Sequence, residues 1–193
     1  MKPIWIVLGL VALLIVVLLF AGGSYVSSRN QMVAKDQNVQ AAFSEIDVNL
    51  QRRADLIPNL VATVKGYANV EETVLNSIAQ ARSGLLQAKT PDEKLAANDR
   101  LNVALLPLLR LQENYPQLKS NDQFMRLQDE LAGTENRIAV ARRRYNEAIR
   151  DYNTFIQQFP NSVWASYAGF HPKNEYYTAE PGSKVAPKVD FSK

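Results

Sequence analysis

The chain has 193 residues, no cysteine, one histidine and a net charge of +3 at pH 7. The lack of cysteine excludes disulfides, thiolate metal sites and a cysteine nucleophile, and the mild basicity, with acids and bases mixed along the chain, argues against nucleic-acid binding. Hydrophobic residues make up 47% of the chain and aromatic residues only 9%, a composition that favours one all-helical domain behind a membrane segment.

The N-terminal residues predict a membrane anchor. Ile4 to Ala21 is a run of 18 residues without a charge, and a helix of that length covers about 27 Å, close to the hydrocarbon thickness of a bilayer. A cleaved signal peptide is the alternative, but its apolar core usually spans about 7 to 15 residues, so we favour an uncleaved anchor that contacts lipid through residues 4–21. Trp5 and Tyr25 suit the two membrane interfaces. The Gly-Gly-Ser sequence that follows the run predicts a flexible joint within an anchor region, residues 1–29.

The charges that flank the apolar run do not determine on which side of the membrane the helical part of the chain lies. Lys2 and the amino terminus lie on one side of the run, and Arg29 and Lys35 lie on the other. The positive-inside rule therefore gives a tie.

Residues 37–87 predict one long helix that contains Pro58. Apolar residues alternate at intervals of four and three, as in a heptad seam, and this rhythm keeps its phase across the proline. A turn would bring clustered Gly, Asn or Asp, so we expect a kink in a continuous helix rather than a chain reversal. The bend either wraps the helix around its neighbours or acts as a hinge or partner-docking point. The seam consists of Val39, Phe43, Ile46, Leu50, Arg53, Ile57, Leu60, Val64, Tyr67, Glu71, Val74, Ile78, Ala81 and Leu85.

A second helix is predicted from Thr90 to about residue 113. Thr90 is suited to cap it, Pro91 to occupy its first position, and Glu93 to complete a capping box. Pro107 predicts a bend within this helix.

A third helix is predicted to open with a Ser120–Gln123 capping pattern and to end near Phe159. Its seam is narrower and is flanked by charged residues, as in coiled coils. Together the helices predict a bundle over residues 30–159. The remaining residues, 160–193, are rich in Pro, Gly and Tyr without a helical period, so we expect an irregular extension packed by aromatic residues such as Tyr167 and Phe170.

Two charged residues, Arg53 and Glu71, interrupt the first seam. They lie about 27 Å apart along a helix, too far to pair with each other. Two interpretations remain open: Arg53 reaches a carboxylate on the third helix and Glu71 reaches one of its arginines, or both lean to the seam's edge and stay solvated. Asp55 is expected to form a weak surface pair with Arg52.

Several segments of the chain resemble the LemA family of bacterial membrane proteins. They are "FSEIDVNLQRRADLIPNLVATVKGYANVEETVL", "QENYPQLKSNDQFMRLQDELAGTENRIAVARRRYNEAIRDYN" and the terminal "PKVDF". Phe43 stands where family members commonly have tryptophan, a change that conserves size. The resemblance implies an elongated antiparallel helical bundle tethered to the cytoplasmic membrane, with the bundle in the cytoplasm. It also implies a genetic association with membrane zinc metallopeptidases.

Catalytic chemistry is not predicted. His171 has no second histidine, cysteine or helically spaced carboxylate near it, so a zinc site would lack ligands. Adjacent acidic pairs such as Glu71 and Glu72 point about 100° apart on a helix and do not converge on a substrate. We therefore expect no enzymatic activity, no cofactor and no metal site.

Two functions remain. The first is a membrane-tethered, non-enzymatic scaffold or adaptor that presents helical surfaces to protein partners or to further copies of itself. The second is a regulatory or substrate-presenting subunit of a membrane zinc metallopeptidase. A peptidoglycan- or lipid-acting enzyme would need clustered acids that the sequence lacks. The candidate structural or partner-contact residues are Arg53, Asp55, Pro58, Glu71, Arg142, Tyr167 and Phe170.

Overall fold

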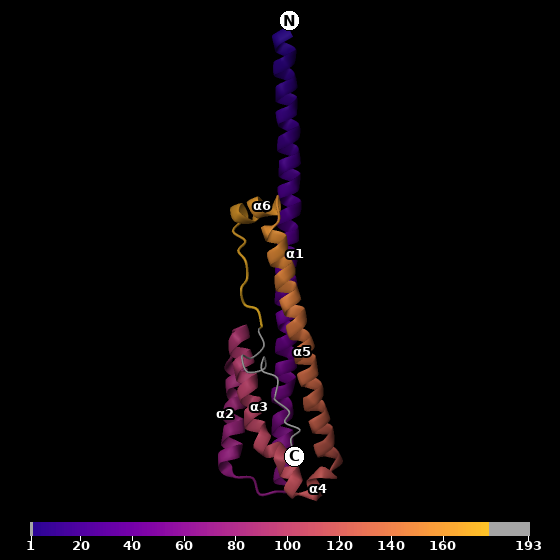
Figure 1. Ribbon diagram of the computed structural model, residues 1–193, viewed down its shortest axis with the longest axis vertical. Coiled ribbons are helices and arrows are strands. Elements are labelled where there is room, and N and C mark those ends of the chain that lie inside the picture. Colours follow the sequence, from indigo (N-terminus) through magenta and orange to yellow (C-terminus); the bar gives the residue numbers. More distant parts are fainter. Residues whose placement is uncertain (1, 178–193) are drawn as a thin grey trace, which may run out of the picture. The chain divides into compact units, whose positions relative to one another are not determined.

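The computed structural model describes residues 2–177, and all regular structure in that part of the chain is α-helical (Figure 1). This confirms the predicted all-α class. The helices are α1 (Lys2–Lys65), α2 (Glu72–Gln87), α3 (Pro91–Asn114), α4 (Pro116–Lys119), α5 (Asp122–Gln157) and α6 (Asn161–Ala168).

Helix α1 begins with the apolar run and continues without a break into the bundle. Its side chains from Ile4 to Phe20 are exposed, and the helix is long and apolar enough to cross a membrane, consistent with an anchor or a signal. The flexible joint predicted at 22–24 was wrong, because these residues are helical. Each glycine costs a helix interior only about 1 kcal/mol, which is too little to interrupt a helix that is already formed on both sides.

Pro58 lies inside α1, and the chain does not reverse there. This confirms the predicted continuity at the proline. The predicted continuity from residue 37 to 87 was wrong, because α1 ends at Lys65 and α2 begins at Glu72. Gly66 permits the turn: its backbone passes so close to Thr63 that an added Cβ would lie 3.3 Å from the Thr63 carbonyl oxygen.

The start of α3 follows the sequence prediction. Thr90 accepts a hydrogen bond from the Glu93 backbone N–H at 3.2 Å, and the Glu93 carboxylate accepts from the Thr90 N–H at 3.2 Å, so the capping box is complete. Hydrogen bonds from the backbone N–H groups of Lys89 and Thr90 lower the pKa of Glu93.

The start of α5 differs from the prediction by one residue. Asn121 Oδ1 accepts from the Phe124 N–H at 2.8 Å, whereas the Ser120 hydroxyl donates back to the carbonyls of Pro116 and Gln117. The short helix α4 precedes this turn and places Ser120 at its own C-terminus, where carbonyl acceptors rather than N–H donors are free.

The described residues fall into two compact units, and both α1 and α5 contribute to each. In the first unit, the part of α1 that follows the apolar run packs antiparallel to residues 144–157 of α5: Phe43 contacts Tyr145 with ring centroids 5.9 Å apart, and Lys35 lies over the Phe155 ring. The buried apolar residues of this unit are Met32, Val39, Tyr145, Ile149, Tyr152, Ile156 and Ala165.

Residues 171–174 are tied to α5 within this first unit. Tyr152 donates its hydroxyl to the His171 carbonyl at 3.1 Å, and the Asn153 amide group both donates to and accepts from the Lys173 backbone. Lys173 Nζ lies 2.9 Å from a carboxylate oxygen of Asp36 on α1. Burial raises the pKa of Tyr152.

The second unit combines residues 45–65 of α1 with α2, α3, α4 and residues 122–143 of α5. α5 runs antiparallel to α1 here as well, since Arg52 pairs with Glu130 and Tyr67 pairs with Asn121. Its core is built largely from the predicted seams: Ile46, Leu50, Ala54, Ile57, Leu60, Val64, Ile78, Leu85, Leu101, Leu105, Leu108, Phe124, Leu131 and Ile138 are buried.

The C-terminal segment was predicted to be irregular, but residues 161–168 form α6, so the prediction was wrong there. The segment is too short to show a helical period in the sequence. Which side of α6 is buried and which is exposed depends on its contacts with α1. The predicted seam position Phe159 is 85% exposed, and Ile156 is buried in its place. Residues 178–193 of the predicted extension lie outside the described residues.

Candidate functional site

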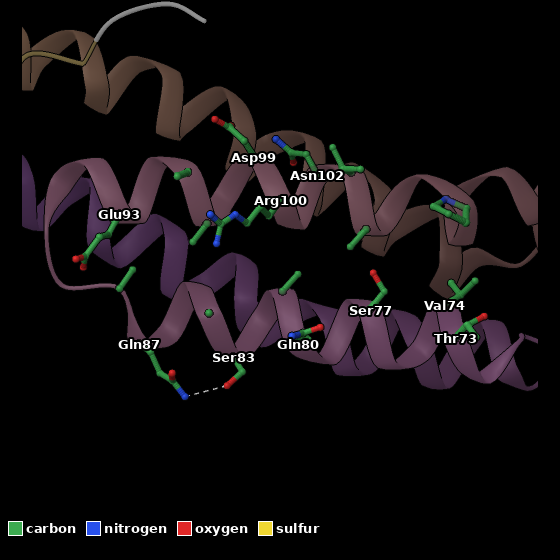
Figure 2. Close-up of a pocket in the computed structure, with 18 residues that line it drawn as sticks. Thr73, Val74, Ser77, Gln80, Ser83, Gln87, Glu93, Asp99, Arg100 and Asn102 are labelled. Carbon is green, nitrogen blue, oxygen red and sulfur yellow. Dashed lines mark hydrogen bonds between the residues drawn. The ribbon is translucent and has the colours of Figure 1, made fainter.

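The candidate site is an open groove on the hairpin of α2 and α3 in the second unit (Figure 2). A three-residue connection joins the two helices, so they lie side by side (Figure 1). The groove is lined by Thr73, Val74, Ser77, Gln80, Ala81, Ser83, Gly84, Gln87, Ala88, Glu93, Ala96, Ala97, Asp99, Arg100, Asn102, Val103, Ala104 and Pro107.

Small side chains form the floor of this groove. On α2, Ser77, Ala81 and Gly84 recur at intervals of four and three, which places them on one side of the helix, and Ala88 follows directly after the helix end. A Cβ added at Gly84 would meet no atom within 4 Å. A partner backbone can approach such a surface closely, as at helix–helix contacts with small residues.

Apolar and charged side chains of α3 border the groove. Val103 is 67% exposed, and Figure 2 shows Arg100 reaching between the two helices while Asp99 lies on the other side of α3. Glu93 is held at the end of the groove by its capping box. The described lining therefore offers dispersed polar groups around an apolar strip, and its acidic residues do not converge.

No group of three or more His, Cys, Asp or Glu residues that could hold a metal ion occurs in residues 2–177. The predicted absence of a metal site remains a prediction.

Arg53 crosses the core of the same unit and joins three helices. It is 6% exposed, forms an ion pair with Glu135 of α5, and donates to Asn98 Oδ1 at 3.1 Å and to Asn102 Oδ1, both on α3. The predicted carboxylate partner on the third helix is confirmed. A buried guanidinium is tolerated only when such acceptors surround it, so this Arg53 cluster (Arg53, Asn98, Asn102 and Glu135) fixes how α1, α3 and α5 face one another within the unit.

Pro58 is explained by a contact between α1 and α2. Proline has no N–H and leaves the carbonyl of residue 54 without its helical donor. Arg82 Nε on α2 donates to that Ala54 oxygen at 2.7 Å, so a side chain of the next helix replaces the missing backbone bond. Pro58 itself is exposed. We call this contact the Pro58–Arg82 tie.

The predicted pair of Asp55 with Arg52 was wrong, and of the two interpretations of Glu71 the structure supports the solvated one. Asp55 lies 3.9 Å from Arg82 rather than pairing with Arg52, which reaches Glu130 at 3.1 Å. Glu71 is exposed at the start of α2, where its carboxylate accepts from the Thr73 hydroxyl at 3.4 Å. The turn at 66–71 removes Glu71 from the seam, so it does not reach the arginines of α5.

The remaining candidates lie apart from the groove. The Arg142 guanidinium lies over the Tyr177 ring, 5.8 Å from its centroid, within the second unit. Tyr167 is 81% exposed on α6 and contacts Tyr25 edge to face in the first unit. Phe170 is half-buried just after α6, where its N–H donates to the Ala165 carbonyl. The structure thus does not gather the seven candidates into one site.

The sequence matches a known protein family. The LemA family model matches residues 42–191, which include the described part of the second unit and its groove. The chain belongs to the LemA family. A curated relative, "Protein LemA" of Metamycoplasma hominis, is 28% identical over 118 residues, covering 59% of this chain and 52% of the relative. The chain thus spans about half the length of that LemA protein.

The groove residues of this LemA family member were missed by the sequence analysis. The signal is present in the sequence, because Ser77, Ala81 and Gly84 form a small-residue stripe that borders the apolar seam of α2, and Ala81 belongs to both. The role of Arg82 is harder to predict from the sequence. Pro58 leaves the Ala54 carbonyl without its helical donor, and an arginine on the next helix is suited to donate to it.

Proposed function

We propose that this protein is a single-pass adaptor of the bacterial cytoplasmic membrane that performs no catalysis itself and binds a helix of a membrane protein, or of a second copy, in the α2–α3 groove. The observation that carries the proposal is the groove itself. It combines a small-residue floor with exposed apolar residues on an accessible face, the combination that accepts a helix.

The continuity of α1 supports the tether. One uninterrupted helix connects the apolar run to residues 45–65, which carry Arg53 and the Pro58–Arg82 tie. The family resemblance supports a bundle on the cytoplasmic side.

Site-specific crosslinking in native membranes tests the adaptor function. A photoreactive amino acid replaces Val103 in the groove or, as a matched control, Val140, an exposed valine of α5 that does not line the groove. We expect one membrane protein, or a second copy, to be captured in stoichiometric amount from position 103 and not from position 140. Equal capture from both positions, or none from either, would contradict the proposal.

The identity of the captured protein decides between the two modes of action. Stoichiometric capture of a membrane zinc metallopeptidase would favour a regulatory or substrate-presenting subunit. Capture of self-copies alone would exclude that role and favour a homo-oligomeric scaffold.

A further inference from the structure

The exposed side of α6 in the first unit is aromatic and uncharged. On α6, Val163 and Tyr167 lie one turn apart and are 54% and 81% exposed, whereas Ala165 on the opposite side is 3% exposed; Phe159, just before the helix, is 85% exposed. The chain carries no charged residue from Phe159 to Phe170. Exposed rings gathered on one side of an element indicate a surface that contacts an apolar partner.

The contacts of α6 fix its level along α1. Ser28 Oγ donates to Asn161 Oδ1 at 2.8 Å, and the Tyr25 ring packs edge to face on Trp164 and Tyr167 at 5.5 and 5.9 Å between centroids. Figure 1 shows α6 lying against α1 at this point.

At this level Tyr25 lies within the headgroup layer of a bilayer spanned by the apolar run, and Ser28 lies just outside that layer. Tyr25 and Ser28 follow Ala21 by four and seven residues, or about 6 and 10 Å along a helix. The headgroup layer on each side of the hydrocarbon core is about 5 to 8 Å thick. Helices that lie in a membrane interface bury their apolar side about 5 to 10 Å into the headgroup and acyl boundary.

The orientation of α6 agrees with this position. Tyr25 is three residues nearer the apolar run than Ser28, and it contacts Trp164 and Tyr167, whereas Ser28 contacts Asn161. Trp164 and Tyr167 therefore contact α1 nearer the apolar run than Asn161 does. Tyrosine and tryptophan are the residues enriched at membrane interfaces.

The charges near α6 also favour contact with a lipid surface. The first acidic residue of α1 is Asp36, about 22 Å beyond Ala21, while Arg29 is exposed one residue after Ser28. Residues 159–174 contain no acid. A neutral or basic surface at this level is attracted to anionic lipid headgroups.

We propose that α6 is a membrane-interface helix, with Phe159, Val163 and Tyr167 inserted at the boundary between headgroups and acyl chains. It would hold α1 at a set depth and tilt through the contacts with Tyr25 and Ser28. The inference rests on the proposed membrane anchoring of α1.

Fluorescent labels in the full-length chain test this position. The chain has no cysteine, so Val163→Cys, Val16→Cys and Val33→Cys each give one labelling site for an environment-sensitive dye. Val16 lies within the apolar run, and Val33 lies on α1 about 18 Å beyond Ala21, outside the headgroup layer. The proteins are reconstituted singly into lipid nanodiscs of phosphatidylethanolamine and phosphatidylglycerol that contain nitroxide-labelled lipid.

The dye at position 163 is expected to show blue-shifted emission and quenching by nitroxides at the headgroup and upper acyl chain. Quenching at position 16 should be strongest for deep acyl nitroxides, and position 33 should resemble the dye in water. Water-like emission at 163 with a quenched position 16 would overturn the interface helix while leaving the anchor intact. Blue-shifted emission at 163 without lipid quenching would also overturn it and would indicate contact with protein, such as a second copy. An unquenched position 16 would contradict the anchor itself.

Discussion

The Pro58–Arg82 tie predicts that two substitutions on different helices are energetically coupled. With Pro58 present, the Ala54 carbonyl depends on Arg82, which donates to it at 2.7 Å. Replacing Arg82 by methionine keeps most of the side-chain length but leaves this part-buried oxygen without a donor, at a cost of about 1–2 kcal/mol in the free energy of unfolding. With Pro58→Ala, the new backbone N–H of residue 58 bonds to the same oxygen, so Arg82→Met should then cost about 0.5 kcal/mol or less.

The double-mutant cycle isolates this contact. Arg82 also lies 3.9 Å from Asp55, whose side chain is 58% exposed; such a surface pair is worth about 0–1 kcal/mol and is lost equally in both backgrounds. Pro58→Ala alone should stabilise the protein by about 1–2 kcal/mol, less than the full proline penalty of about 3 kcal/mol in a helix interior, because Arg82 already compensates for the missing bond.

Denaturant unfolding of the full-length protein in detergent micelles, followed by circular dichroism, measures the four stabilities. We expect a coupling energy of about 1 kcal/mol or more, above the roughly 0.3–0.5 kcal/mol scatter of independent sites. Additive effects of Pro58→Ala and Arg82→Met would refute the assigned role of Arg82.

Three further substitutions test other parts of the structure. Arg53→Met should lower the free energy of unfolding by about 2–4 kcal/mol, because it leaves the fully buried Asn98 without its donor. Adding Asn98→Leu should restore at least about 1 kcal/mol, since the unpaired atom is then removed. No recovery in the double variant would contradict the described cluster. The pKa of Glu93 is lowered in the folded state, so its stabilising effect is present above the ordinary carboxyl pKa of about 4.3 and is lost as pH falls through the lower folded value. Glu93→Gln should therefore flatten the acid limb of a stability–pH curve, and an unchanged limb would argue against the capping role. Gly84→Ala should raise the free energy of unfolding by about 0.5–1 kcal/mol, because the residue is helical with open space around it; a loss of stability in the same unfolding assay would show that the site is closed.

The sequence predicted those features that depend on short-range patterns. The capping box at Thr90 and Glu93 follows from residue types at fixed spacing, and the continuity of α1 at Pro58 follows from an unbroken hydrophobic rhythm. The apolar run was equally evident, because length and composition alone define it.

The turn at 66–71 could not be predicted from the same rhythm. The seams of α1 and α2 happen to keep the phase of a single helix across the turn, so periodicity gave no sign of the reversal. Gly66 and Asn69 were the local signals, but they are not adjacent, and an isolated glycine inside a helical pattern is usually tolerated. The seam position assigned to Glu71 followed from the same assumption of a continuous helix.

The groove and the α6 surface depend on tertiary packing. Ala81 and Gly84 are recognisable as small residues in the sequence, but whether their side of α2 is covered depends on where α3 packs. Val163 and Tyr167 are likewise ordinary apolar residues until the contacts with Tyr25 show which side of α6 is exposed.

The measurement that tests the central claim most directly is capture from position 103 when the groove is filled. Gly84→Trp places a large side chain in the open space of the groove, and Asn76→Trp places the same side chain on an exposed position of α2 that does not line it. With both variants folded by circular dichroism, the adaptor proposal predicts that Gly84→Trp abolishes crosslinking from position 103 and that Asn76→Trp preserves it. Undiminished capture by Gly84→Trp would contradict the assignment of the groove as the binding surface.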